Sequence, residues 1–317
     1  MKRAYIKDIV KDTLVNDFFI VVKKGIFTSK NGSRYMTARL RDKTGTIEAR
    51  IWDRVDELSS AFDRNDLVYV HSKAKTYQDA IQLTVTDIEK VDKELSLEDM
   101  REFYPENESG SARARDAFYG LIEGINNTHV KSLFTCLTGR KDLLDRFFLV
   151  PASVGVHHMY MGGLLEHSVT IAEMGKRITS LTETDTDLVV GGCLLHDIGK
   201  VDEITVKGGF VYSDRGRLLG HIVLGVMILD DLIREAGQFP DDLADVLRHI
   251  VVSHHGEQEW GSPKKPMCLE AMVVHSLDNL DARLSGVKEY MMDGMEDERW
   301  TQYHRLYESR FYRIPVR

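Results

Sequence analysis

Seven side chains of types that commonly bind metal ions recur along the second half of this chain. They are histidines and aspartates, whose imidazole nitrogens and carboxylate oxygens hold Mn, Fe, Co, Zn or Mg. Successive clusters lie roughly 23 to 33 residues apart, about the length of one helix and one loop. Successive helices could therefore each present one set of ligands to a shared pocket. The seven residues are His167, His196, Asp197, His221, His254, His255 and Asp278.

The adjacent pair His196-Asp197 carries the most information. A single buried histidine is usually a core residue with satisfied hydrogen bonds. An ionised aspartate that follows the apolar run Leu188-Val189-Val190 is different, because burying it without a metal or another cation would be costly. The pair therefore favours a metal centre over an ordinary packed core.

The local sequences around the seven residues resemble a known family. They read GGLLEHS, LLHDIGK, LLGHIVLG, VVSHHG and VHSLDNLDA. Their order is similar to that of the HD superfamily of metal-dependent phosphohydrolases, and their detail resembles the bacterial 3′-5′ exoribonuclease group that includes YhaM. The resemblance extends over nearly the whole chain. It implies an N-terminal OB-fold, a C-terminal HD domain and exonuclease activity.

The resemblance also implies a centre of two divalent ions that share one aspartate. The first ion would take His167, His196, Asp197 and Asp278. The second would take Asp197, His221, His254 and His255. Two ions about 3.5–4 Å apart can activate water and hold a phosphoryl oxygen, so that a phosphodiester is cleaved without a covalent intermediate. Mn or Co is expected from the family, while Fe, Zn, Mg or Ni would also suit these ligands.

Four further residues are candidates for catalysis beside Asp197. Lys200 directly follows the HDIG turn and could stabilise charge on a phosphate, or it could be a solvated lysine at a helix end. His157 and His158 precede the first ligand and could touch the scissile phosphate, or they could be an ordinary pair in a loop. Arg283 could meet a substrate phosphate.

Three other residues near the motifs could have supporting roles or none. Asp281 lies one helical turn after Asp278 and could orient a ligand, as residues behind a metal ligand commonly do. His275 could equally be structural. His249 precedes His254 by five residues, which is off the face of the helix, so it is left out of the site.

Helices must position these residues, since the apolar residues of the second half recur with helical spacing from residue 112 onward. The pattern places His167 early in a helix, His196-Asp197 and His254-His255 at helix ends before a glycine, His221 at a helix start and Asp278 inside a helix. A short hairpin around Gly208-Gly209 interrupts the run. The second domain is therefore expected to be all-α, with six or more helices.

The first 90 residues instead show the alternation of short strands. Five strands are expected, separated by turn sequences such as Asp42-Lys43-Thr44-Gly45, with a short helix near residues 55–62. This pattern suits a small barrel of OB type. We therefore expect an OB-fold nucleic-acid-binding domain over residues 1–90, a charged linker over 91–115 and an HD phosphohydrolase domain over 116–317.

Aromatic and basic residues are interleaved in the expected barrel, as in proteins that stack bases and neutralise phosphates. Any one of these aromatic residues could instead pack in the barrel, and Trp52 is the strongest candidate for that role. The candidates for nucleic-acid binding are Lys23, Lys24, Phe27, Arg34, Tyr35, Arg39, Arg50, Trp52, Lys75 and Tyr77.

Charge is unevenly distributed along this chain of net charge −8. Residues 1–90 hold 17 Lys and Arg against 13 Asp and Glu, whereas the remainder holds 25 against 37. A basic module joined to an acidic one is expected if the first binds phosphate and the second holds cations. The three cysteines are far apart and indicate a reduced, cytoplasmic protein, and no signal peptide or membrane-spanning run is evident.

The favoured function is a metal-dependent 3′-5′ exonuclease that hydrolyses single-stranded RNA and could extend to single-stranded DNA. One alternative is a phosphohydrolase of small nucleotides, which would not need an OB platform. Another is a nucleic-acid-binding regulator whose HD domain only senses a ligand, which the full set of seven ligands argues against. No P-loop and no G-x-S-x-G motif is present. Homo-oligomerisation is left open.

Overall fold

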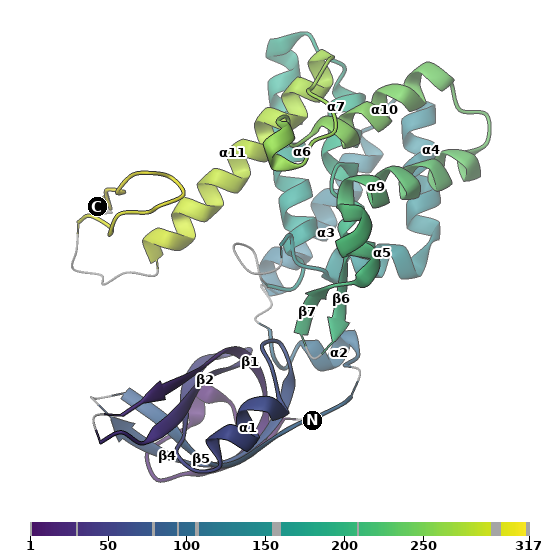
Figure 1. Ribbon diagram of the computed structural model, residues 1–317. Coiled ribbons are helices and arrows are strands. Elements are labelled where there is room, and N and C mark those ends of the chain that lie inside the picture. The colour runs from purple at the N-terminus through teal and green to yellow at the C-terminus, as the bar shows by residue number, and fades with distance from the viewer. Residues whose placement is uncertain are drawn as a thin grey trace. The chain divides into compact units, whose positions relative to one another are not determined.

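The computed structural model divides the chain into two compact units (Figure 1). The first comprises Met1–Glu108 and Ile204–Ser213, and the second comprises Ser109–Glu203 and Asp214–Arg317. The residues that the structure describes are 2–29, 31–77, 80–93, 95–104, 108–153, 160–207, 209–292 and 299–314. No helix within these described ranges is long and apolar enough to cross a lipid bilayer.

A closed five-stranded barrel forms the body of the first unit, in the order β1-β2-β3-β5-β4. Neighbouring strands are antiparallel except β3 and β5, which are parallel, and the helix α1 (Val55–Ala61) lies between β3 and β4 in the chain. This arrangement confirms the expected OB-type barrel. The strands are β1 (Leu14–Thr28), β2 (Arg34–Asp42), β3 (Gly45–Ile51), β4 (Leu67–Tyr77) and β5 (Ala80–Lys90).

Side chains alternate between the inside and the outside of the barrel, as the period of two in a strand requires. On β2, Met36, Ala38 and Leu40 are buried in the barrel core, whereas Tyr35 and Arg39 point outward. The alternation explains how a short strand contributes both to the core and to the surface.

Other elements of the first unit come from two separate parts of the chain. The 3-10 helix η1 (Ile6–Asp8) precedes the barrel and α2 (Leu97–Met100) follows it. The hairpin of β6 (Ile204–Lys207) and β7 (Gly209–Tyr212) belongs to this unit by its contacts, and the Phe210 ring packs edge-on against Tyr104. Contacts thus group residues 91–108 with the barrel. The domain limits expected from the sequence remain a prediction.

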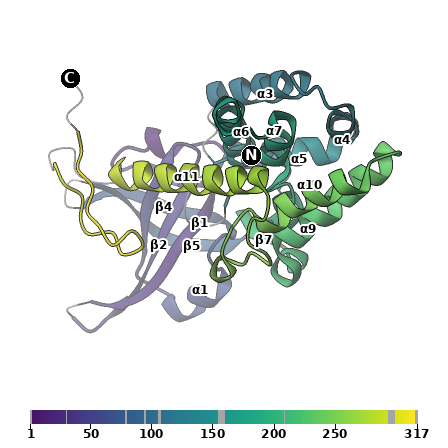
Figure 2. The same cartoon turned by 90° about the horizontal axis from the view of Figure 1, so that it is seen from above.

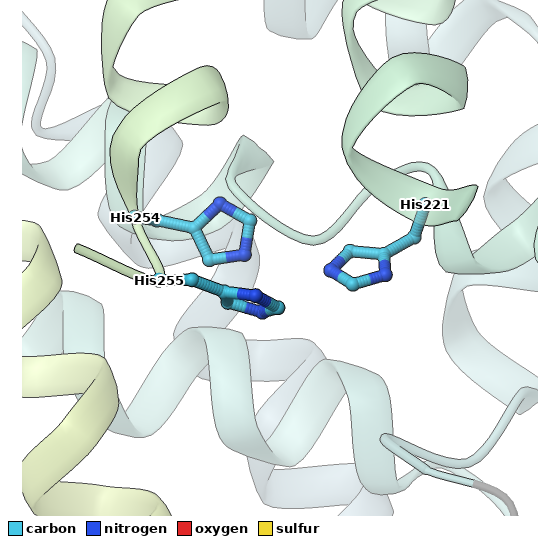
Figure 3. Close-up of side chains that lie close together, drawn as sticks. All are labelled: His221, His254 and His255. Atoms are coloured by element: carbon cyan, nitrogen blue, oxygen red, sulfur yellow. The ribbon is translucent and has the colours of Figure 1, made fainter. Parts of the chain in front are cut away.

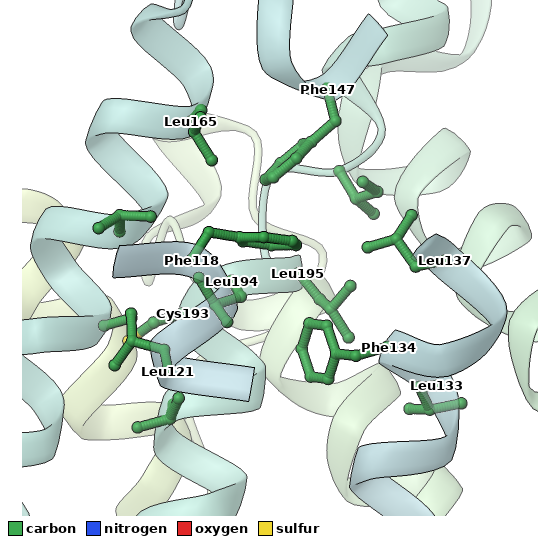
Figure 4. Packing of buried hydrophobic residues seen from close by; sticks show 14 of the residues in the cluster. Phe118, Leu121, Leu133, Phe134, Leu137, Phe147, Leu165, Cys193, Leu194 and Leu195 are labelled. Atoms are coloured by element: carbon green, nitrogen blue, oxygen red, sulfur yellow. The ribbon is translucent and has the colours of Figure 1, made fainter. Parts of the chain in front are cut away.

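Helices make up nearly all of the second unit, which confirms the expected all-α architecture. A buried aromatic group lies between its first helices, with Phe118 packed against Phe134 and Phe147 (Figure 4). Removing one such ring would cost about 3–5 kcal/mol of stability. The elements are α3 (Glu108–Glu123), α4 (Thr128–Gly139), α5 (Lys141–Leu149), α6 (Gly163–Thr182), α7 (Thr186–Leu195), α8 (Lys200–Glu203), α9 (Asp214–Ala236), α10 (Asp241–Ser253), the 3-10 helix η2 (Gln258–Trp260) and α11 (Leu269–Met292).

Helix α11 is the longest of these helices and has two different surroundings. It contacts α6, α7 and α10. Its C-terminal part extends away from the other helices of the unit (Figures 1 and 2). The core of the unit therefore lies around the first half of α11. Residues 299–314 lie near the other end of the helix.

Candidate metal centre and nucleic-acid interface

Five helices of the second unit bring the seven candidate metal ligands together, each near the position in a helix that the sequence pattern predicted. His167 is the fifth residue of α6, and Asp278 lies inside α11. His196 and His254 directly follow the last residues of α7 and α10. Residues at helix ends can turn toward a common point while the packed helices hold them still.

Glycines allow α9 to approach the HD turn closely enough to deliver His221. Gly220 has φ 72°, a left-handed conformation, and divides α9 so that a new helical segment starts at His221. A Cβ on Gly199 would lie 1.9 Å from the carbonyl oxygen of His221. Any larger residue at position 199 would therefore displace the start of this segment.

One side of the site, which we call the carboxylate half, consists of His167, His196 and Asp278. His167 Nε2 lies 3.2 Å from Asp278 Oδ1 and 3.3 Å from His196 Nε2. These three ligand atoms are all within 4.8 Å of one another. Such spacing is suitable for one metal ion held between them.

The other side, the histidine half, consists of His221, His254 and His255. His221 extends from α9 toward the two histidines at the end of α10 (Figure 3). Their ligand nitrogens also lie within 4.8 Å of one another. The division of ligands that the family resemblance implies places the same residues in these two groups, and it remains a prediction.

Asp197 faces both halves with different oxygens. Its Oδ2 lies 3.2 Å from His196 Nε2 in the carboxylate half. Its Oδ1 lies 3.4 Å from His221 Nε2 and 3.6 Å from His254 Nε2 in the histidine half. The side chain is almost fully buried, so the carboxylate is held in position to be shared.

The other ring nitrogen of every histidine in the site has a partner of its own. His196 Nδ1 donates to Cys193 O at 2.8 Å, and His254 Nδ1 donates to Val251 O at 2.7 Å. Because a backbone carbonyl only accepts, these contacts fix Nδ1 as the protonated nitrogen and leave Nε2 as a ligand. The remaining Nδ1 partners are Asp281 for His167, Glu203 for His221 and the Trp260 carbonyl for His255.

Electrostatics differ between the halves. Burial works to lower the pKa of His167, but the hydrogen bonds to Asp278 and Asp281 outweigh burial and raise it to about 9. Burial lowers the pKa of His254 to about 4 and also lowers that of His255. At neutral pH His254 is therefore an uncharged ligand, whereas His167 binds a proton between two carboxylates.

The polar atoms that face the middle of the site fit a divalent cation. Asp197 Oδ1, His221 Nε2 and His254 Nε2 are buried without a hydrogen-bond partner among the described residues. Buried acceptors left unpaired are costly, and a cation between them would satisfy all three. The donor set of imidazole and carboxylate groups suits Mn, Fe, Co or Zn.

The further catalytic candidates have different outcomes. Lys200 Nζ lies 2.6 Å from Asp197 Oδ2, so it is an inward-facing residue of the site and not a solvated lysine. Burial works to lower the pKa of Lys200, but Asp197 outweighs it and the net shift is upward. Arg283 is exposed on α11, and the structure gives it no contact with the seven residues among those described. His157 and His158 lie outside the described residues.

Several supporting residues were not evident from the sequence. Glu203 at the end of α8 accepts from the backbone N–H of His221 and lies 3.3 Å from its ring. The Trp260 carbonyl orients His255, and His275 donates to the carbonyl of His254 at 2.7 Å. Asp281 was considered from its spacing as a residue that could orient a ligand, and its Oδ2 lies 2.7 Å from His167 Nδ1. Glu203 and the Trp260 carbonyl gave no signal in the sequence.

The barrel of the first unit presents a second feature of interest on its outer surface. Strand register places Phe27 opposite Tyr35, and Thr37 opposite Arg50. Tyr35 stacks on Trp52 with ring centroids 4.8 Å apart, and the Arg50 guanidinium lies 4.5 Å from the centre of the Tyr77 ring. We call this group the barrel platform; its members are Phe27, Tyr35, Arg50, Trp52 and Tyr77.

The platform brings the four predicted aromatic residues together. Some of the predicted basic residues are instead paired with other groups of the barrel. Phe27, Trp52 and Tyr77 are exposed, so Trp52 is not a core residue of the barrel. Lys23 and Lys75 are also exposed. Lys24 instead donates to the Ser59 carbonyl and pairs with Asp63. The two other arginines form ion pairs, Arg34 with Asp56 and Arg39 with Glu48.

Comparison with known families agrees with both units. Residues 164–283 match the HD domain, which is characteristic of a superfamily of metal-dependent phosphohydrolases. Residues 20–91 match the OB-fold nucleic acid binding domain. The chain therefore contains an HD domain and an OB-fold domain.

The solved structures that are similar to this chain each cover less than a third of it. The second OB-fold domain of replication protein A from Methanococcus maripaludis is 20% identical over 29% of this chain and 98% of that chain, with a TM-score of 0.24. The mitochondrial single-stranded DNA binding protein Rim1 from S. cerevisiae is 16% identical over 26% of this chain and 97% of that chain, with a TM-score of 0.23. The p204 HINb domain is 17% identical over 28% of this chain and 46% of that chain, with a TM-score of 0.24.

Proposed function

We propose, because this chain joins an HD domain to an OB-fold nucleic-acid-binding domain, that it is a metal-dependent exonuclease of single-stranded nucleic acid. The observation that carries the proposal is Asp197, whose two oxygens face two separate groups of ligand atoms. We assign His167, His196 and Asp278 with Asp197 to one ion, and His221, His254 and His255 with Asp197 to a second.

The residues of the chain would prepare the site before substrate arrives. Hydrogen bonds at the Nδ1 atoms hold the histidine rings so that their Nε2 atoms converge. Two divalent ions bound there would supply Lewis acidity toward a phosphoryl oxygen and activate a water molecule for in-line attack. Lys200, which neutralises Asp197 in this structure, would become available to a phosphate oxygen once cations neutralise that carboxylate.

Substrate selection would depend on the barrel platform. Every base has a π-face, so the exposed rings of Phe27, Trp52 and Tyr77 can hold a strand regardless of its sequence. A duplex hides those faces, which favours single strands. A small nucleotide would need no such platform, which is why we prefer a polymer substrate to that alternative.

The finer properties come from the family resemblance. Resemblance to YhaM-like 3′-5′ exoribonucleases suggests RNA as the polymer, attack from the 3′ end, and Mn or Co as the metal. The same site could accept single-stranded DNA, since nothing in the ligand set distinguishes the two sugars.

Incubation with labelled single strands tests the function. RNA and DNA of one sequence, labelled at the 5′ end, are incubated with the protein and Mn²⁺, with and without EDTA, and the products are sized over time. We expect a ladder that shortens one nucleotide at a time from the 3′ end, stops near a stem and disappears with EDTA. Rapid cleavage of a circular single-stranded RNA would indicate an endonuclease. If no polymer is cleaved, the two alternative functions remain, a phosphohydrolase of small nucleotides and a nucleic-acid-binding regulator.

Platform substitutions separate binding from chemistry. Tyr35→Ala removes the ring on which Trp52 stacks and so should disturb base stacking on Trp52. It should raise KM for a polymer by about fivefold or more, because one stacked base contributes roughly 1–3 kcal/mol. Hydrolysis of the small ester bis-p-nitrophenyl phosphate should not change. Tyr212→Ala, which alters an exposed tyrosine of the hairpin in the same unit, is the matched control. If both substitutions change KM for the polymer equally, the barrel platform does not select the substrate.

A further inference from the structure

The last described residues, 299–314, form a small folded segment that the metal centre does not use. Two antiparallel bridges pair Trp300 with Tyr312 and His304 with Ser309. Backbone hydrogen bonds run from Thr301 N to Phe311 O at 2.9 Å and from Arg313 N to Arg299 O at 2.7 Å. The segment, which we call the C-terminal hairpin, therefore has a defined conformation.

The C-terminal hairpin is attached to the end of α11 by one of its faces. The Tyr290 hydroxyl donates to Gln302 O at 3.1 Å, and Arg313 Nε donates to Met291 O at 3.0 Å. The Tyr290 ring packs edge-on against His304 at 4.4 Å. These contacts use the partly buried aromatic residues of the hairpin and hold it against the helix.

The other face leaves large apolar side chains in solvent. Trp300 and Tyr303 are each 54% exposed, and Leu306 is 71% exposed. The Trp300 and Tyr312 rings lie beside each other at 5.1 Å. Tyr303 has no ring contact among the described residues. Aromatic rings that a folded hairpin holds outward, when other rings of the same segment are packed, indicate a surface for a ligand.

Charge distinguishes the C-terminal hairpin from the rest of its unit. Residues 299–314 contain four arginines and one glutamate, whereas the other residues of the second unit up to residue 298, 109–203 and 214–298, contain 17 Lys and Arg against 29 Asp and Glu. Arg299, Arg305 and Arg310 are exposed, and none of them forms an ion pair with another described residue. The segment is therefore a basic island on an acidic unit.

We propose that the C-terminal hairpin is a second binding surface for single-stranded RNA. Exposed rings interleaved with arginines that have no ion-pair partner among the described residues provide stacking for bases and charge for phosphates, the same chemistry as the barrel platform. An acidic unit repels a phosphate backbone, so a basic surface on that unit would attract a strand that the rest of the unit repels. The inference rests on the proposed function only in taking a polymer as the ligand.

Removing the three exposed positive charges tests the surface. The triple variant Arg299→Gln, Arg305→Gln and Arg310→Gln is compared with a control that removes the same charge elsewhere on the second unit, Lys141→Gln, Arg177→Gln and Arg234→Gln. Both are made in the Asp197→Asn protein so that the probe, a fluorescent oligouridine, stays intact. Affinity is measured over a series of salt concentrations.

The expected result is a loss specific to the C-terminal hairpin. The triple variant should bind more weakly, and the slope of log K against log salt should fall by up to about 2, because each phosphate contact on a single strand contributes roughly 0.7. Tyr303→Ala should weaken binding by about fivefold or more. Ultraviolet crosslinking of oligouridine to the unsubstituted full chain should label peptides that contain Trp300 or Tyr303.

Three outcomes would overturn the inference. One is equal affinity and salt slope for the triple variant and its control. Another is crosslinking confined to the first unit. The last is a change of molar mass in light scattering with unchanged RNA affinity, which would make the hairpin a contact between copies of the chain. If Tyr35→Ala weakens RNA binding and the hairpin variants do not, the hairpin surface is refuted and the proposed function stands. If the unsubstituted chain does not bind RNA, both the hairpin surface and the proposed function are refuted.

Discussion

The carboxylate half and the histidine half share Asp197 but surround it differently. In the carboxylate half, His167 and His196 are buried, and Asp278 and Asp281 both contact His167. In the histidine half, His221 and His255 are partly exposed, and burial lowers the pKa of His254 and of His255. Coulomb attraction for a cation should therefore be stronger in the carboxylate half.

The difference indicates that the two halves hold their ions with different strengths. A buried site with several carboxylates holds an ion firmly. A more open site with neutral ligands exchanges its ion and its water more readily, which suits the side that a phosphate approaches. Three experiments test whether the two halves differ in this way.

The largest effect is expected at the one residue that both halves share. Asp197→Asn should lower hydrolysis by about 10³-fold or more, beyond the 10–100-fold that loss of an outer partner costs. The number of metal ions bound per chain, measured by elemental mass spectrometry, should fall because both halves lose a ligand. Asp231→Asn changes an exposed carboxylate of the same unit and should have no effect. Normal activity and metal content in Asp197→Asn would exclude a shared ligand.

A smaller effect is expected from residues that orient one half each. Asp281→Asn removes the charged partner of His167, and Glu203→Gln removes that of His221. Each should cost about 10–100-fold in metal affinity or activity. Metal titration should show weakened binding of one ion only, the tighter one in Asp281→Asn and the weaker one in Glu203→Gln. The reverse assignment would contradict the comparison.

The smallest effect is a difference in how metal binding depends on pH. The pKa of His167 is raised to about 9, so an ion that enters the carboxylate half near neutral pH must displace a proton. Affinity there should rise about tenfold per pH unit up to about pH 9 and then level off, as expected when one proton is displaced. The pKa of His254 is lowered to about 4 and that of His255 is also lowered, so affinity in the histidine half should depend less steeply on pH over the same range.

Calorimetry in two buffers of different ionisation enthalpy measures this proton release. More proton should leave with the tighter ion than with the weaker ion, because His254 and His255 are already unprotonated near neutral pH. Equal release in both steps would show that the two halves do not differ in protonation.

Sequence alone predicted the seven candidate ligands, which the structure brings together, and the helices that carry them. Residue type and helical period are local properties, and each ligand stands beside its own apolar helical run, as with His167 in α6 and Asp278 in α11. The barrel could be predicted for the same reason, because alternation along strands such as residues 34–42 is a local pattern.

Tertiary structure decided which atoms meet. No spacing in the chain places Glu203 beside His221, or the Trp260 carbonyl beside His255, because those partners belong to a different element or loop from their ligand. Composition likewise gives the basic, aromatic character of residues 299–314. Only packing against Tyr290 decides that His304 is partly covered while Tyr303 remains in solvent, since burial depends on what lies against a side chain and not on its neighbours in sequence.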